Sequence, residues 1–473
     1  MKRTAAILAL AAGLAACGGK QGTITVTVLV PTGADPFDGA ASVHMALGSP
    51  VVFEITVPVN QGHFDAQIQF KPPNGMVVDG PLIIEALDAS GKIIARGQSP
   101  VLGFQPTDYQ VSVWVGPVGR FGGSPAALTV GRARMAVAAI PRVGAFMAGG
   151  AVGGTPSTLV DIYDAYYHQV VSGTPLAAGR MGAVAIGFDR TDQSNGAALL
   201  VGGGDTKASE ELTLFDPQPG STGVWSALAT DPSLARFDPT AAALSDGSVL
   251  VSGGRGNDGK PLASAVLLVL PPSVSVTPLT KTPMTTARAG HTATAITLPS
   301  SGGDGLFLFG GNSDGAAAEI FTAATNSFKV QDLGPALPTR IGHTATKLAD
   351  GRVLIAGGSD QTARPLATGF ILDTDLTVEK TPVILQTARS GHTATLSGGE
   401  LLLCGGSDAN GVALANCDVL DGKTLAPTRT IPLAAARTKG VAVILDTGNL
   451  LLAGGTGSDG TAVTTLELYT PMP

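Results

Sequence analysis

Seven pairs of adjacent glycines, each at the end of an apolar run and roughly fifty residues from the next, constrain the fold of this chain more than any other feature. The runs that lead into them read AFMAGG, ALLVGGG, VLVSGG, LFLFGG, VLIAGG, LLLCGG and LLLAGG. A constant period of this length is typical of rings built from one repeated small sheet. It predicts the architecture and leaves the activity open, because such a scaffold carries its chemistry in its loops. The pairs are Gly149-Gly150, Gly203-Gly204, Gly253-Gly254, Gly310-Gly311, Gly357-Gly358, Gly405-Gly406 and Gly454-Gly455.

Each repeat has one order of parts: an arginine, a strand, a tight turn, a second strand ending in Gly-Gly, a polar loop, and two further strands. Asp350-Gly351 and Gly398-Gly399 supply the positive φ values that such a turn needs. Short strands joined by glycine-rich turns also fit a composition with 64 Gly and 32 Pro. The repeats therefore predict an all-β chain.

The repeats resemble kelch repeats, in which apolar residues precede a double glycine and an aromatic pair follows. Phe215 with Trp225, and Phe321 with Phe328, fit that aromatic pair. The resemblance implies a seven-bladed kelch β-propeller over residues 119–473. The third, fifth and sixth units lack the aromatic pair, so the sequence leaves their outer strands open.

The end of the chain predicts how the ring closes. The last unit stops at TLELYTPMP, which leaves no residues for a fourth strand after the third. We expect a segment within Val118 to Thr129 to supply that strand, since closing a ring removes an exposed sheet edge.

Residues 1–16 have the pattern of a secretory signal. Lys2 and Arg3 precede a short apolar stretch, which falls below the ~20 residues that a membrane span takes. The stretch ends in LAAC at Cys17, which resembles the lipobox of bacterial lipoproteins. The resemblance implies cleavage before Cys17 and acylation of its thiol, and the alternative is an ordinary signal that leaves Cys17 free.

Residues 17–22 then form a lipid anchor and a flexible tether. The residue after the cysteine is Gly18 and not aspartate, which by the same resemblance favours the outer membrane. We therefore expect a protein of the cell envelope, facing the periplasm or the surface, whose first partner is the membrane.

Residues 23–118 lack the Gly-Gly repeat and alternate apolar and polar residues in TITVTVLV, VVFEITVPV and YQVSVWV. This pattern is typical of half-buried strands. The stretch resembles the immunoglobulin-like or prealbumin-like β-sandwiches found between an anchor and a working domain. We interpret it as a spacer.

The net charge of the chain bears on its partners, and its cysteine content bears on its covalent bonds. The net charge of −7 without a basic cluster argues against nucleic acid as a partner. Cys404 and Cys417 lie in one repeat across a glycine-containing loop, where an exported protein can form a disulfide. Two buried thiols are the alternative.

Arginine recurs once per repeat, and a carboxylate recurs in the third strand of five repeats. Paired positions of this kind predict partly buried ion pairs, with an arginine-lined binding funnel as the alternative. The arginines are Arg134, Arg180, Arg236, Arg288, Arg340, Arg389 and Arg437, and the acids are Asp161, Glu211, Glu319, Asp418 and Glu467.

His291, His343 and His392 share one position in three consecutive GHTAT segments. Equivalent positions of a ring are too far apart to bind one metal ion, so we expect these histidines to pack between blades.

The polar loops after the glycine pairs carry aspartates that we expect on one face of the ring. Turn chemistry favours aspartate there, and a rim that binds a divalent cation or a polar partner is the alternative. These residues are Asp205, Asp258, Asp314, Asp360, Asp408 and Asp459.

These observations favour a membrane-anchored binding or assembly scaffold with a protein or glycan ligand. The alternative is a carbohydrate-active enzyme or lectin with its site in the funnel, since galactose-oxidase-like enzymes also join a β-sandwich to a seven-bladed kelch propeller. Such copper sites need paired tyrosines, two histidines and a cysteine, and this chain has five tyrosines but no cysteine free for the purpose. The catalytic residues of sugar mutarotases cannot be mapped. We assign no catalytic or metal-ligating residue and expect no cofactor.

Overall fold

The computed structural model describes residues 7–10, 24–60, 79–103, 109–190, 195–218, 222–299, 301–311, 317–334, 337, 339–379 and 381–473. Within these ranges the regular secondary structure is strand, apart from two short 3-10 turns, η1 (Pro232–Leu234) and η2 (Ala323–Thr325). None of the described helices has the length and apolar character of a membrane span.

Seven four-stranded antiparallel sheets follow one another along the described residues from 120 onward. We number them from first to seventh. The first sheet holds β12 (Ala136–Ile140), β13 (Gly144–Ala148), β16 (Val160–Asp164) and β17 (Gln169–Ser172), and the second holds β18 (Met181–Phe188), β19 (Ala197–Gly204), β20 (Glu211–Asp216) and β21 (Val224–Thr230). The third sheet holds β22 (Thr240–Ala243), β23 (Val249–Ser252), β24 (Ala265–Val269) and β25 (Ser275–Pro278), the fourth holds β26 (Thr292–Thr297), β27 (Asp304–Phe309), β28 (Ala318–Thr322) and β29 (Ser327–Gln331), and the fifth holds β30 (Ile341–Lys347), β31 (Val353–Ser359), β32 (Leu366–Leu372) and β33 (Val383–Arg389). The sixth sheet holds β34 (Thr393–Ser397), β35 (Glu400–Cys404), β36 (Asn416–Asp421) and β37 (Pro427–Pro432), and the seventh holds β38 (Val441–Ile444), β39 (Leu450–Ala453), β40 (Thr465–Thr470) and β11 (Arg120–Ala127).

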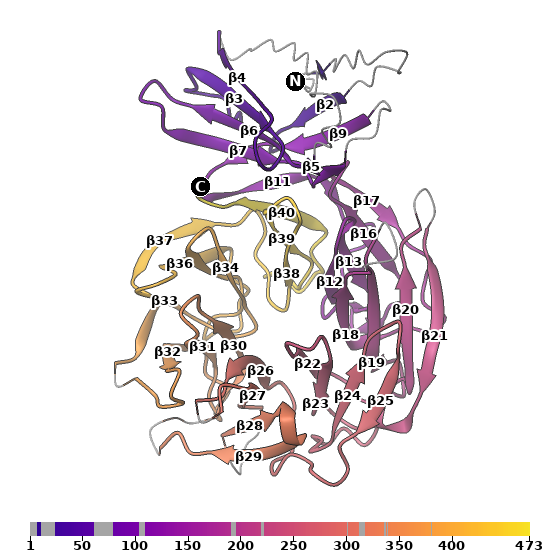
Figure 1. Ribbon diagram of the computed structural model, residues 1–473. Coiled ribbons are helices and arrows are strands. Elements are labelled where there is room, and N and C mark those ends of the chain that lie inside the picture. The colour runs from indigo at the N-terminus through magenta and orange to yellow at the C-terminus, as the bar shows by residue number, and fades with distance from the viewer. Residues whose placement is uncertain are drawn as a thin grey trace.

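The sheets form a ring, as Figure 1 shows. The innermost strand of each sheet contacts that of the next, from β12 through β18, β22, β26, β30 and β34 to β38, and β38 contacts β12 again. This is a β-propeller-like arrangement. Small residues such as the TAAA of β22 and the TATAIT of β26 let these strands lie close to the axis.

The second strand of each sheet explains the apolar runs in the sequence. β31 and β39, for example, are buried over Val353–Gly358 and over all of Leu450–Ala453. A strand with a neighbouring sheet on each face buries both rows of its side chains, so its sequence does not alternate. Clusters between sheets hold the ring together, such as Phe146 and Ile162 of the first sheet against Leu200 and Phe215 of the second.

The ring closes as the sequence predicted. β11 pairs antiparallel with β40, with Arg120 opposite Thr470 and Gly123 opposite Glu467, and completes the seventh sheet. The outer strands that the sequence left open are also present, as β25, β33 and β37.

The N-terminal part contains β1 (Ile7–Leu10), β2 (Ile24–Leu29), β3 (Ser42–Leu47), β4 (Phe53–Pro58), β5 (Asp79–Gly80), β6 (Leu82–Leu87), β7 (Ile93–Gln98), β8 (Leu102–Gly103), β9 (Tyr109–Trp114) and β10 (Gly116–Pro117). They form a three-stranded sheet β1-β2-β9, a five-stranded sheet β10-β7-β6-β3-β4 and the pair β5-β8. One core joins the two larger sheets, with Val28, Val111 and Val113 packed in the same cluster as Met45 and Ile84. The short β1 lies within the predicted signal.

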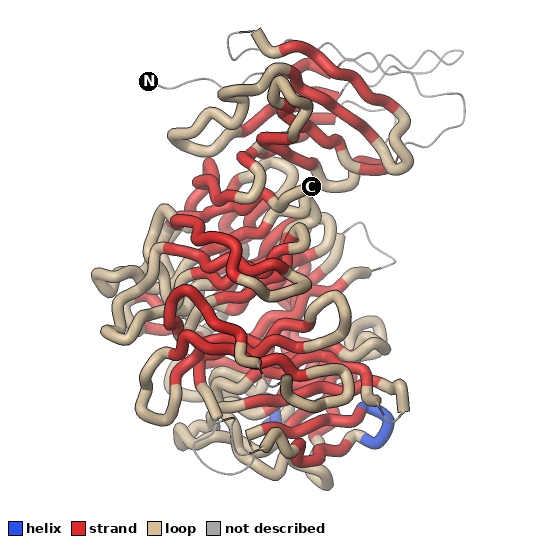
Figure 2. The backbone as a smooth tube through the Cα atoms, turned by 90° about the vertical axis from the view of Figure 1, so that its left-hand side faces the viewer, coloured by secondary structure: helices blue, strands red, loops and turns tan. Residues whose placement is uncertain are grey.

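The N-terminal part is fixed to the outer edge of the ring, beside β11 and β17 (Figures 1 and 2). The turn between β16 and β17 reaches into it: the Ser112 amide donates to the Tyr166 carbonyl at 2.9 Å, and the Trp114 amide to His168 Nε2 at 3.2 Å. His168 Nδ1 lies 2.8 Å from the Tyr163 hydroxyl. This joint leaves the centre of the ring uncovered.

Candidate functional site

The repeated arginine ties each sheet to the sheet before it. In six sheets its guanidinium donates to the carbonyl of the first glycine of its own sheet, as from Arg236 to Gly253 at 3.0 Å. In the second sheet the Arg180 guanidinium contacts Thr213 and Glu211. The backbone carbonyl of the repeated arginine accepts from the second glycine of the preceding sheet, as from Gly203 to Arg236 at 2.8 Å. The repeated arginines and the glycine pairs therefore act together, and we call this set of residues the buried circle. Its arginines are Arg132, Arg180, Arg236, Arg288, Arg340, Arg389 and Arg437.

Two sequence assignments on this circle were wrong by a short shift. In the first sheet Arg132, and not Arg134, donates to the Gly149 carbonyl, and its own carbonyl accepts from Gly455 of the seventh sheet. In the second sheet the working pair is Gly202-Gly203, and not Gly203-Gly204. Both segments, GRAR and VGGG, offer two residues of the right type, and only the three-dimensional contacts select one.

The glycines are required by close approach as well as by conformation. Gly405 has φ +65°, and a Cβ there would lie 2.4 Å from the Arg437 carbonyl oxygen. The equivalent Cβ at Gly310 would lie 2.4 Å from the Arg340 carbonyl oxygen. A left-handed φ and a backbone atom at that distance together exclude any side chain.

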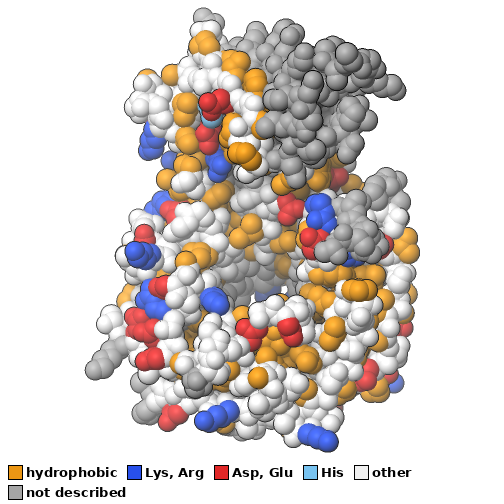
Figure 3. Space-filling model, viewed as in Figure 1, with side chains coloured by type: hydrophobic (Ala, Val, Ile, Leu, Met, Phe, Trp, Pro, Cys, Tyr) orange, Lys and Arg blue, Asp and Glu red, His pale blue; other side chains and the backbone are white. Residues whose placement is uncertain are grey.

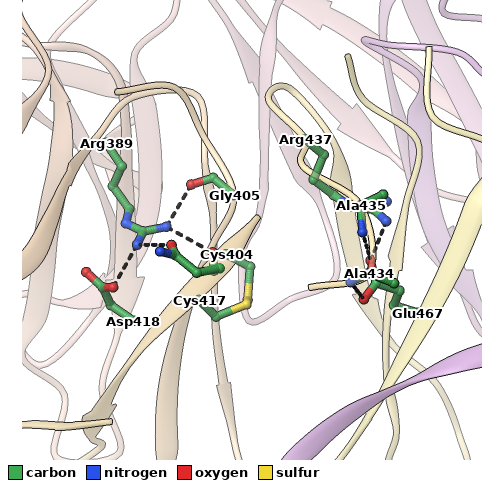
Figure 4. The surroundings of a disulfide bond; sticks show 10 residues. Arg389, Cys404, Gly405, Cys417, Asp418, Ala434, Ala435, Arg437 and Glu467 are labelled. Atoms are coloured by element: carbon green, nitrogen blue, oxygen red, sulfur yellow. Dashed lines mark hydrogen bonds and ion pairs between the residues drawn. A yellow bond between two sulfur atoms is a disulfide. The ribbon is translucent and has the colours of Figure 1, made fainter. Parts of the chain in front are cut away.

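Carboxylates of the third strands compensate most of the buried arginines. Arg288 and Glu319 are both fully buried and 3.0 Å apart, and Glu319 also accepts from the Thr285 amide at 2.8 Å. Figure 4 shows the equivalent pairs in the sixth and seventh sheets. The remaining pairs are Arg132 with Asp161, Arg180 with Glu211, Arg389 with Asp418, and Arg437 with Glu467. Arg236 and Arg340 have no carboxylate partner among the described residues, and burial lowers the pKa of each to about 10.

The three GHTAT histidines lie between neighbouring sheets. His291 Nε2 lies 2.9 Å from Ser252 Oγ, and His343 Nε2 3.0 Å from Thr292 Oγ1. His392 Nε2 is 3.0 Å from Thr344 Oγ1. Burial, with nearby arginines second, lowers the pKa of each histidine to about 3, so all three are neutral. The described residues contain no cluster of three metal-ligating side chains.

Cys404 and Cys417 lie opposite each other on β35 and β36 and form a disulfide (Figure 4). Cys404 directly precedes Gly405, so the covalent bond braces the sixth sheet where it meets Arg437.

The loop aspartates cap their own turns. Asp360 Oδ1 accepts from the Thr362 and Arg364 amides, and Asp459 Oδ1 accepts from the Thr461 amide. Asp258 and Asp408 do the same, whereas Asp205 is exposed and has no side-chain bond of this kind. Asp314 and Cys17 lie outside the described residues. These bonds are the ones by which aspartate commonly stabilises a turn.

The sequence reasoning missed a second circle, two residues after each buried arginine, which we call the mouth circle. All seven residues have a left-handed φ between +50° and +75°. Backbone bonds join some of the neighbouring members, from Asp238 to the Gly182 carbonyl, from Gly391 to the Gly342 carbonyl and from Lys439 to the Gly391 carbonyl. Figure 3 shows the surface hollowed at the centre of the ring. The members are Arg134, Gly182, Asp238, Gly290, Gly342, Gly391 and Lys439.

Charged side chains occupy three places on the mouth circle. Arg134 Nη2 donates to both oxygens of Asp238, at 2.6 and 2.5 Å, although the two residues belong to the first and third sheets. The pair passes over Gly182, where a Cβ would lie 2.4 Å from Asp238 Oδ1. Lys439 is exposed, and no described carboxylate pairs with it. Alignment of the repeats on the correct arginines would have revealed this circle.

No protein-family model and no curated protein matches the chain. Among solved structures it is similar to YjhT, with 18% sequence identity and a TM-score of 0.45 over 60% of this chain and 93% of that chain. The fold described above rests on the strands and contacts of this chain itself.

Proposed function

We propose that this chain is an exported lipoprotein that presents a seven-bladed, kelch-type β-propeller as a binding or assembly module at the cell envelope. Each four-stranded sheet would be one blade, and the N-terminal part an immunoglobulin-like or prealbumin-like sandwich between anchor and propeller. The glycine pairs, the closed ring and the lipobox-like LAAC support this proposal.

The observation that carries the binding role is the position of the N-terminal part. It is fixed to the edge of the ring by β11 and by the turn at Tyr166, and in Figures 1 and 2 it covers neither the centre nor the loops around it. A chain anchored through that part would hold the propeller away from the membrane with its mouth open to a ligand. The Cys404–Cys417 disulfide fits an exported location.

The anchor is tested by expressing the full chain and its Cys17→Ala variant in a Gram-negative host and separating membranes from soluble periplasm. We expect the first in the membrane fraction, with the mass of the acyl chains on its N-terminal peptide, and the variant in the soluble fraction. Equal fractionation of the two proteins would overturn the lipoprotein assignment.

The binding role is tested by thermal unfolding of the detergent-solubilised protein against glycans, divalent cations and a chelator, because a ligand of the native state raises the melting temperature. A shift with a sugar would favour the lectin or enzyme alternative, and a shift with a cation the aspartate rim. No shift across the panel would leave a protein ligand as the candidate.

A further inference from the structure

The mouth circle carries charged residues in one part of the ring, where the repeat elsewhere has glycine. Gly290, Gly342 and Gly391 occupy it in the fourth, fifth and sixth sheets, whereas the seventh, first and third sheets carry Lys439, Arg134 and Asp238. The backbone conformation is the same throughout, and it is one that costs energy for any residue with a Cβ atom and suits glycine. Glycine would therefore serve the ring at all seven places, and the charged residues call for a reason other than the fold.

The charges on this arc do not cancel. Arg134 and Lys439 are two cations, and Asp238 is one anion, so one positive charge remains. Arg134 is held by Asp238 through Nη2 alone, while its Nη1 faces the thioether of Met181 at 3.2 Å. A thioether is a weak acceptor, so this edge of the guanidinium can gain a better one.

The opposite arc is bare and partly apolar. A Cβ added at Gly290 would meet only Ile341 Cγ2, at 3.2 Å, and Ile341 is 49% exposed. The Lys439 side chain lies over Gly391, 3.6 Å from the place of its missing Cβ. The mouth thus combines two cationic donors with an arc of glycines that is lined by Ile341 and by the hydroxyl groups of Ser390 and Thr438.

We propose that the mouth binds a ligand with a carboxylate group attached to a small apolar part, with Arg134 and Lys439 as the contacts of the carboxylate. Arginine binds a carboxylate through parallel hydrogen bonds, and lysine adds a second charge-assisted bond. Asp238 positions the guanidinium, and Ile341 contacts the apolar part. A free organic acid and the carboxyl terminus of a peptide share this chemistry. The inference rests on the proposed binding role and deepens it.

The experiment replaces Arg134 and Lys439 with glycine, the residue that the fourth, fifth and sixth sheets carry at the same place. Binding of propionate, of trialanine and of trialanine amide is measured by calorimetry for the full-length protein in detergent and for its Arg134→Gly and Lys439→Gly variants. We expect the wild-type protein to bind the free carboxylates, the amide to bind at least tenfold more weakly, and each variant to lose at least tenfold in affinity. Preference for trialanine over propionate would identify a peptide terminus, and the reverse a free acid.

A stability readout separates this role from a structural one. Glycine adopts the left-handed backbone conformation without strain. We therefore expect the melting temperature of each variant to lie no more than about 1–2 °C below that of the wild type. A residue that merely tied the first sheet to the third would instead lower the melting temperature when replaced. Ala363→Gly, at an exposed turn with φ +62°, is the matched control for backbone relief and should leave binding unchanged.

Two results would overturn the proposal: no carboxylate bound by the wild-type protein at 10 mM, set at roughly ten times a weak millimolar Kd, or equal affinity in the wild type and both glycine variants. Neither result bears on the Cys17 fractionation or on the wider ligand panel, so the anchored binding role would stand or fall separately.

Discussion

The buried circle and the mouth circle lie two residues apart in every repeat, yet the chain treats them differently. On the buried circle all seven sheets carry arginine, and in six of them its guanidinium donates to a glycine carbonyl of the backbone. On the mouth circle the backbone is equally regular, but the side chains are glycine in four sheets and charged in three. The comparison teaches that the ring is specified by contacts that reach backbone atoms, which leaves the adjacent circle free to carry function.

Acid should have the largest effect, because it protonates the histidines that are buried between the sheets and at the joint with the N-terminal part. Burial lowers the pKa of His291, His343 and His392 to about 3, and that of His168 to about 4. Since the unfolded value is near 6.5, the unfolded chain binds protons between pH 6.5 and 4 that the native chain does not. Native stability therefore falls as pH falls through this window, by about 1.4 kcal/mol per pH unit for each histidine. Urea unfolding from pH 7 to 4.5 measures this slope.

The His343→Asn variant sharpens this prediction. Its side chain retains a polar group near Thr292 but does not titrate, so the slope below pH 6.5 should fall by roughly one histidine's share. An unchanged slope, or stability independent of pH down to 4.5, would contradict the buried neutral state of these residues.

Removing a carboxylate from the buried circle should cost nearly as much. Glu319→Ala removes the buried carboxylate that balances the charge of Arg288 and accepts from the Thr285 amide, which we expect to lower the free energy of unfolding by about 3–5 kcal/mol. Glu211 is the matched control: it pairs with Arg180 at 3.4 Å but is 53% exposed, so Glu211→Ala should cost at most about 1 kcal/mol. Chemical denaturation at pH 7 compares them, and equal losses would refute the distinction.

Two glycines of the sixth sheet compare the circles directly. Gly405 and Gly391 have φ values of +65° and +67°, so alanine strains the backbone equally at both. At Gly405 the new Cβ would lie 2.4 Å from the Arg437 carbonyl oxygen, whereas at Gly391 the nearest atom is Thr438 Oγ1 at 3.1 Å. We expect Gly405→Ala to lower stability by about 2–4 kcal/mol and Gly391→Ala by about 1 kcal/mol.

The thermal unfolding of these two variants isolates the steric part of the requirement, because the conformational part is common to both. A Gly391→Ala variant as unstable as Gly405→Ala would mean that the mouth circle is as constrained as the buried one.

What the sequence could predict is what depends on local chemistry. Glycine pairs, turn aspartates and the missing last strand each leave a mark within a few neighbouring residues, and the seven sheets and the pairing of β11 with β40 followed from them. The choice of Arg132 over Arg134 depended on reaching Gly149 and Asp161, and no local signal separates the two. The mouth could not be predicted because Arg134 and Asp238 are 104 residues apart and meet only after the ring closes.

Removing the disulfide should cost less than removing Glu319. Cys404 and Cys417 are separated by 13 residues, and closing a loop of that length stabilises a protein by about 3 kcal/mol through the unfolded chain, with smaller values common. The sister sheets carry Ala356 and Ala453 in the place of Cys404, so Cys404→Ala should leave the native contacts of Gly405 intact. We expect a loss of about 2–3 kcal/mol, measured by thermal unfolding with the Cys417→Ala variant alongside, and an equal loss in the wild type under reducing conditions. A variant that lost more than the reduced protein would show that the thiol also packs against the sheet, and the covalent bond would then not be the whole of its contribution.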